Sequence, residues 1–153
     1  MATNERDSTH WLWRLDANAW LAAAHTELVQ GRAQLASRRT AVTHARRAAG
    51  MALNATLVTL AARGWSRERC ETAWGRSYID HLRALSASLD DPSERGREPF
   101  DLEQCQRCRE LLQIPVMPPA GLVRLARSKD EAASAALDTA TALVRGCAAL
   151  IGS

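Results

Sequence analysis

Aromatic residues are scarce in this sequence of 153 residues, and runs of β-branched residues are absent. Aromatics make up 5% of the chain, and five of the seven are tryptophans. Alanine and leucine dominate instead, a composition that points to helices. The length fits one domain with a single buried core. We therefore predict an all-α fold.

The sequence also lacks a long apolar run and an export signal. No stretch of about 18 apolar residues occurs, so no membrane span is expected. The beginning, MATNERDSTHWLW, has no basic segment followed by an apolar core, so a cytoplasmic protein is expected. The net charge of +3 is mild, and it permits contact with nucleic acid without arguing for it.

Cysteine is present at four positions without an obvious pairing. Cys105 and Cys108 form a lone C-x-x-C, whereas a structural zinc site usually combines two such motifs. Buried helical cysteines with free thiols are the main expectation, so neither a metal nor a cofactor is predicted. Zinc held by these two residues, with Cys70 and Cys147 completing the set, is the alternative.

The stretch from Thr40 to Gly64 organises the chain. Its apolar residues recur at intervals of three and four, which places them along one side of a helix. Alanines line the first half and allow close approach of a neighbouring helix, while leucines follow in the second half. Thr40 is the predicted N-cap, and Gly64 is the predicted terminator with positive φ. We expect this helix to lie at the centre of a bundle.

Similar patterns predict the remaining helices. They run over 16–36, 66–74, 77–90, 101–113 and 128–150, with a short basic link at 37–39 that implies antiparallel neighbours. Gly75 is a predicted break, and the predicted N-caps are Asp16, Ser66, Ser77, Asp101 and Ser128. Residues 90–99 are predicted to be a polar loop, and residues 114–121 an extended segment. Residues 1–15 are an N-terminal extension with a leading turn, and 16–151 form an up-down bundle of four to five helices.

The order of these helices resembles the HEPN family (higher eukaryotes and prokaryotes nucleotide-binding). WLAAAHTEL, from Trp20 to Leu28, resembles the WLxxAxxDL opening of that family. HARRAAGMALNA, which begins at His44, is similar to its second-helix pattern HAQQAAEKALKA. HLRAL, which begins at His81, is similar to its HSLLEL segment. The resemblance covers roughly residues 16–150.

What the resemblance implies is a helical homodimer that acts with RNA or nucleotides. Family members include partners of minimal nucleotidyltransferases in toxin–antitoxin modules, and metal-independent ribonucleases whose active site forms where two subunits meet. The ribonucleases carry an R-x4-6-H motif. This chain has one such string, from Arg76 to His81, so these two residues are the predicted catalytic pair. The family often has Asn, Asp or His directly after the arginine, where this chain has Ser77. In one branch a tyrosine modified by the partner enzyme stands where this chain has Arg83.

An arginine and a histidine suit RNA cleavage without a metal. Imidazole can take the proton of a ribose 2′-hydroxyl, and guanidinium can stabilise charge on the phosphate. In an unbroken helix, however, five residues turn by about 140°, so Arg76 and His81 would face different ways. His81 would then fall in an apolar stripe with Leu82 and Leu85. The alternative is a non-catalytic helical interaction module, which predicts a buried, well-packed His81.

A second group of candidates lies around the N-terminal end of the central helix. His44 stands where the family also has histidine, so it is a candidate ligand contact as well as a packed or dimer-facing side chain. Arg39, Arg46 and Arg47, together with Arg38, form a basic patch that could hold a nucleotide or an RNA backbone. A solvated charged face is the competing interpretation. Trp11, Trp13 and Trp20 are expected in the core or at an interface, with base stacking as the lesser alternative.

Overall fold

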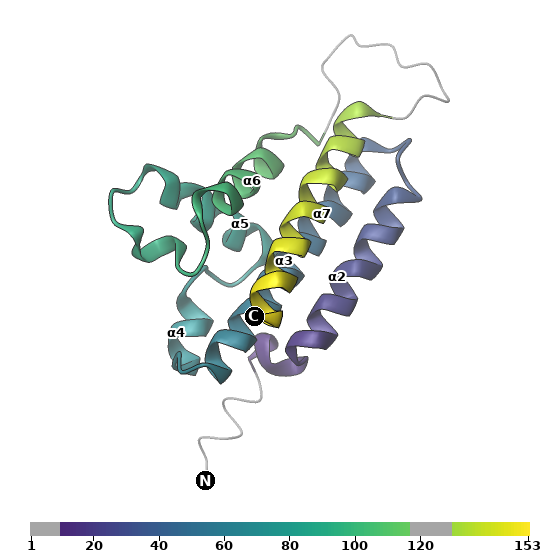
Figure 1. Cartoon of the computed structure of the whole chain (residues 1–153). Coiled ribbons are helices and arrows are strands. Elements are labelled where there is room, and N and C mark those ends of the chain that lie inside the picture. The colour runs from purple at the N-terminus through teal and green to yellow at the C-terminus, as the bar shows by residue number, and fades with distance from the viewer. Residues whose placement is uncertain (1–9, 117–129) are drawn as a thin grey trace.

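The computed structural model describes residues 10–116 and 130–153, except the side chains of residues 94 and 95. All regular structure within these residues is helical, so the all-α prediction is confirmed. The longest helices are α2 (Ala17–Arg32), α3 (Arg38–Ala62) and α7 (Glu131–Gly152). They lie side by side, with the shorter helices on the other side of α3 and α7 (Figure 1). The shorter helices are α4 (Arg67–Thr72), α5 (Tyr78–Ala87) and α6 (Leu102–Gln113), and the 3₁₀ turns are η1 (Trp11–Arg14), η2 (Ser88–Asp90) and η3 (Glu94–Arg97).

Helix α3 is the centre of the bundle, as predicted. It contacts α2, α4, α5, α6 and α7, and it is buried almost all round between Ala48 and Leu57. Alanines in its first half allow close approach of its neighbours. A close approach occurs at Gly50, where an added Cβ would lie 2.3 Å from the Cβ of Tyr78 on α5. A helix segment that is mostly apolar on every side belongs in a core, and residues 48–57 of α3 are such a segment apart from Asn54 and Thr56.

The start of α3 differs from the prediction. Ser37 is the N-cap, its hydroxyl oxygen accepts a hydrogen bond from the backbone nitrogen of Thr40, and Arg38 is the first helical residue. The segment 37–39 is therefore the first turn of the helix and not a link before it. The physical reason is that serine caps at least as well as threonine, and arginine readily continues a helix. The Ser37 hydroxyl in turn donates to the hydroxyl oxygen of Thr40 at 2.9 Å.

Contacts at both ends align α7 with α3. At the beginning of both helices, Arg38 lies 2.9 Å from the carboxylate of Asp130, the N-cap of α7. At the far end, Arg63 donates to the carbonyl oxygens of Leu150 and Ile151 at 3.1 and 2.9 Å. The N-terminal ends of α3 and α7 therefore lie together, as do their C-terminal ends, so the two helices run parallel. The chain between them makes a long excursion through α4, α5 and α6 (Figure 1).

Most predicted caps and breaks are confirmed. Asp16, Ser66, Ser77 and Asp101 each accept a hydrogen bond from the backbone nitrogen three residues later. Gly64 has a φ of 117° and Gly75 a φ of 81°, a region that L side chains rarely adopt. These caps and glycines set the starts of the short helices α4 and α5 at the predicted positions.

Several boundaries need correction. Helix α2 ends at Arg32 and not near residue 36, because the chain turns at residues 33–36 before Ser37 caps α3. The predicted loop 90–99 contains the turn η3. Leu102 is 56% exposed although it is apolar, because it is the first residue of α6 and the core-facing side begins at Gln104. The predicted cap Ser128 and most of the extended segment 114–121 lie outside the described residues; the N-cap of α7 is Asp130.

Helix α7 is, among the described residues, the one helix long and apolar enough to cross a membrane. Length and composition alone carry that finding, and the core helix of a folded bundle has the same properties. The apolar side of α7 packs on α3, α2 and α6. Packing thus accounts for its composition; the buried residues are Ala133, Ala136, Leu137, Ala140, Leu143, Val144 and Cys147.

Candidate functional site

The predicted catalytic residues lie on either side of the start of α5. Arg76 follows the break at Gly75 and precedes the N-cap Ser77. Its backbone nitrogen lies 3.4 Å from a carboxylate oxygen of Asp80, and its side chain is exposed. His81 lies in the first turns of α5 and faces inward. The two residues therefore leave the same short segment in different environments.

His81 is a core residue with both ring nitrogens engaged. It is 1% exposed. Nδ1 lies 2.8 Å from the carbonyl oxygen of Trp74, and Nε2 lies 2.7 Å from the side-chain oxygen of Asn54 on α3. Burial lowers the pKa of His81, although the hydrogen bond to the Trp74 carbonyl and the nearby Asp80 carboxylate oppose that shift. The buried ring is therefore neutral at physiological pH.

A neutral ring fixes the roles of the two nitrogens. The Trp74 carbonyl can only accept, so the single ring proton lies on Nδ1, and Nε2 must accept. The amide nitrogen of Asn54, which otherwise has no partner among the described residues, supplies that donor when the amide is rotated to face the ring. The lone pair of His81 that a general base would need is then used inside the protein.

Trp11 lies between His81 and the solvent side. The two rings are stacked, with centroids 5.9 Å apart and planes inclined by 24°. The same indole makes edge contacts with Tyr78 and Trp20, at 5.4 and 5.9 Å between centroids. Trp11 comes from η1, some seventy residues before His81 in the chain. The N-terminal 3₁₀ turn therefore covers the histidine that the sequence pattern singled out.

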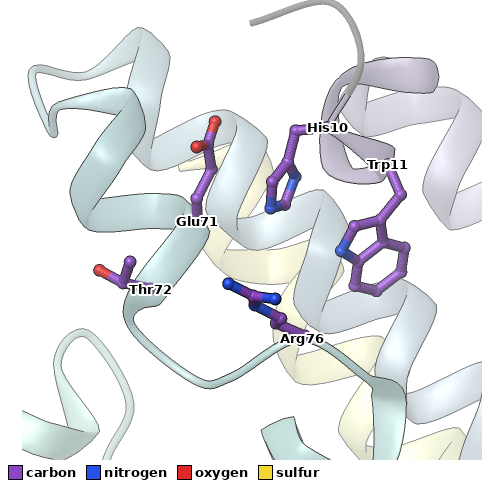
Figure 2. A pocket seen from close by; sticks show the side chains of 5 residues that line it. All are labelled: His10, Trp11, Glu71, Thr72 and Arg76. Carbon is purple, nitrogen blue, oxygen red and sulfur yellow. The ribbon is translucent and has the colours of Figure 1, made fainter. Parts of the chain in front are cut away.

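Arg76 lines a cavity of about 490 Å³ with His10, Trp11, Glu71 and Thr72. Figure 2 shows these side chains around the opening, with His10 and Trp11 on the η1 side and Glu71, Thr72 and Arg76 on the α4 side. His81 is not among the lining residues. The structure thus brings Arg76 together with His10 and Trp11, and it keeps Arg76 and His81 apart.

The chemistry of this cavity is dominated by N–H donors. His10 caps η1, since its Nδ1 accepts from the backbone nitrogen of Leu12 at 3.2 Å. The Nε1 atom of Trp11 is buried and has no acceptor among the described residues. Glu71 is the acid of the lining, and its carboxylate accepts from the indole nitrogen of Trp13 at 2.7 Å. No sequence motif joins His10, Glu71 and Thr72, so their place in this cavity was not predicted. The one signal in the sequence is a histidine directly before the apolar run that starts at Trp11.

The other predicted ligand residues are mostly engaged in the fold. His44 Nδ1 lies 2.5 Å from one carboxylate oxygen of the buried Glu27, and Arg47 lies 3.1 Å from the other. Arg46 donates to three backbone carbonyl oxygens at the end of α6, the nearest being Ile114 at 3.0 Å. Burial, and then the charge of Arg83, lower the pKa of Arg46. Arg39 is exposed on the first turn of α3.

A second cavity, of about 340 Å³, lies between α3 and the start of α5. Arg46 and Arg47 contribute to its wall from α3, and Tyr78 contributes from α5. The predicted basic patch therefore borders a cavity. Two of its arginines are already engaged, because Arg47 pairs with Glu27 and Arg46 donates to carbonyl oxygens at the end of α6. Burial is the main cause that raises the pKa of the Tyr78 hydroxyl, so the phenol stays protonated.

The four cysteines are buried in helices as free thiols. Burial raises the pKa of each, to about 12 for Cys147. Such thiols are poor nucleophiles and poor metal ligands in this state. No cluster of three or more metal-ligating side chains occurs within residues 10–116 and 130–153.

Comparison with known proteins adds no relative to this description: no family model, no curated protein and no solved structure matches the chain.

Proposed function

We propose that this protein is a HEPN-type helical protein that binds RNA or nucleotides and does not cleave RNA. The absence of cleavage is inferred from His81, whose two ring nitrogens are both hydrogen-bonded inside the protein. Nδ1 donates to the Trp74 carbonyl oxygen, Nε2 accepts from the Asn54 amide, and Trp11 stacks on the ring. A general base must reach the proton that it removes, and this ring has no free nitrogen to do so.

The binding half of the proposal rests on the resemblance of the sequence to the family and on Arg76. Its exposed guanidinium borders a cavity large enough for a small ligand. A guanidinium stays charged at every physiological pH and can form two parallel hydrogen bonds to a phosphate. Arg76 thus keeps the phosphate-binding role that the motif implies, while His81 takes a structural one.

The assembly proposed with this function is a homodimer, with a minimal nucleotidyltransferase as the further partner implied by the resemblance. Light scattering coupled to size-exclusion chromatography measures the mass of the purified chain directly. A mass of twice 16.7 kDa supports the dimer, and a mass of 16.7 kDa across the micromolar range overturns it.

RNA binding and cleavage are tested together on the purified full chain. Calorimetric titration with a single-stranded oligoribonucleotide measures affinity, and gel electrophoresis of the same mixture, with chelator present, measures cleavage. Arg76→Gln removes the charge in the cavity, and Arg145→Gln removes an exposed charge on α7 as the matched control.

We expect binding without cleavage, a several-fold loss of affinity in Arg76→Gln, and a smaller loss in Arg145→Gln. Cleavage that disappears in Arg76→Gln would make the protein a ribonuclease. The absence of binding to any RNA or nucleotide would overturn the proposed function and leave the helical interaction module as the better description.

A further inference from the structure

The cavity that Arg76 borders is built from two segments distant in sequence. His10 and Trp11 come from the beginning of the described chain, and Glu71, Thr72 and Arg76 from α4 and the turn after it. Figure 2 shows the imidazole of His10 extending toward the guanidinium of Arg76, with the indole nitrogen of Trp11 on the same side. Three nitrogen-bearing side chains therefore converge on one opening.

Each of these side chains can donate a hydrogen bond there. The guanidinium of Arg76 makes no hydrogen bond or ion pair with any described residue; the one hydrogen bond of Arg76 to a side chain is made by its backbone nitrogen. Because His10 Nδ1 accepts from the Leu12 backbone nitrogen, the neutral ring carries its proton on Nε2. The indole N–H of Trp11 can only donate, and it finds no acceptor within the described chain.

The ring of Trp11 is already engaged by aromatic neighbours within the fold. Its ring stacks on His81 and meets Tyr78 and Trp20 at their edges. What remains of this residue for a ligand is its unsatisfied N–H. A buried donor without an acceptor is unfavourable, and an acceptor that reaches it gains the full hydrogen bond. The group that this N–H lacks is therefore a hydrogen-bond acceptor.

The two other lining residues restrict where such an acceptor lies. The carboxylate of Glu71 is held by the Trp13 indole at 2.7 Å, and Figure 2 shows it directed away from Arg76. The hydroxyl of Thr72 donates to the carbonyl oxygen of Glu68 at 2.9 Å. An anion is therefore favoured on the Arg76 side of the cavity and disfavoured near Glu71.

We propose that this cavity binds a terminal phosphate group, a phosphomonoester at the end of an RNA or on a mononucleotide. Arg76, His10 and Trp11 are the donors. A phosphomonoester presents three terminal oxygens and nearly two negative charges at neutral pH, whereas a phosphodiester inside a strand presents two oxygens and one charge. Three donors from three side chains match the monoester. This inference rests on the proposed function and names the chemical group that the site recognises.

Calorimetric titration with three forms of one short oligoribonucleotide tests the inference. The forms carry a 5′-phosphate, a 3′-phosphate, or hydroxyl groups at both ends. The variants are Arg76→Gln, which removes the cation, and Trp11→Phe, which removes the N–H but keeps a ring against His81. Arg145→Gln is the charge control, and circular dichroism verifies the fold of each variant.

We expect one phosphorylated form to bind about tenfold more tightly than the hydroxyl form, a typical gain for charge-assisted hydrogen bonds. This preference falls to about one in Arg76→Gln, weakens in Trp11→Phe and persists in Arg145→Gln. A purely structural Trp11 would leave the preference unchanged in Trp11→Phe, which overturns its role as a donor.

Competition distinguishes the source of the phosphate. Displacement of the phosphorylated oligonucleotide by adenosine 5′-monophosphate supports a mononucleotide, and resistance to it supports an RNA end. Equal affinity for all three oligonucleotides overturns this inference and leaves the proposed function intact. Failure of all three, and of the mononucleotide, to bind overturns the proposed function itself.

Discussion

The Nδ1 atom of His81 lies 2.8 Å from the carbonyl oxygen of Trp74, the last residue before the break at Gly75. The ring therefore donates its one proton to the segment that leads into α5. Together with the contact to Asn54 on α3, this hydrogen bond ties the start of α5 to the central helix. The burial of this ring leads to a prediction about pH.

Acidification is expected to destabilise the protein through His81. Burial lowers the pKa of His81 in the folded chain, so between that pKa and about 6.5 the unfolded chain binds the proton more readily. Stability is therefore full above pH 6.5 and falls as the pH drops through this window. Urea unfolding at pH 7.5 and pH 5.5 measures the effect.

The control for this prediction is His81→Gln, which keeps a hydrogen-bonding side chain and removes the titration. We expect its free energy of unfolding to change less between the two pH values than that of the wild type. An equal change in both proteins would show that other groups cause the acid sensitivity.

Gly50→Ala is expected to destabilise the protein by about 2 kcal/mol, the usual range for overpacking a close contact. The added Cβ would lie 2.3 Å from the Cβ of Tyr78, an atom too close to the backbone to move away without shifting α5. Gly152→Ala, near the end of α7, meets nothing within 4 Å and is the control. Chemical denaturation of both variants measures the difference, and similar stabilities would contradict the close packing of α3 and α5.

Gly64→Ala is expected to cost about 1–2 kcal/mol for a different reason. Its Cβ would also meet nothing within 4 Å, but Gly64 has a φ of 117°, and alanine is strained there. Thermal unfolding of Gly64→Ala and Gly152→Ala compares two open positions that differ mainly in backbone conformation. A melting temperature of Gly64→Ala at or above that of the wild type would argue against a constrained turn between α3 and α4.

Asp130→Ala is expected to destabilise the protein by about 3 kcal/mol. Asp130 caps α7 and pairs with Arg38, and its side chain is 2% exposed. Asp130→Asn keeps an N-capping oxygen and removes the charge, so we expect it to lose less. Urea unfolding ranks the three proteins. Equal losses in the two variants would mean that the ion pair, and not the cap, holds α7 at the start of α3.

The sequence was a reliable guide where the relevant atoms are close along the chain. Ser77 caps α5 and Gly75 takes a positive φ, as their types and spacing predict. The different environments of Arg76 and His81 do not come from helical phase, because Arg76 lies before the N-cap Ser77 and outside α5. Arg46 shows the limit of such reasoning. It belongs to a basic patch in the sequence, yet in the fold it donates to carbonyl oxygens at the end of α6, some sixty-five residues away.

By itself, the sequence determined the helices, most of their caps and the two glycine breaks, because each depends on hydrogen bonds and periodicity within a few residues. Only the tertiary structure decided that Trp11 covers His81 and that His10 joins Arg76 in one cavity. It also decided that α7 runs parallel to α3, through contacts at Arg38 and Arg63. Those relationships join segments far apart in the chain, and the path between such segments is set by the packing of the whole core and not by any local pattern.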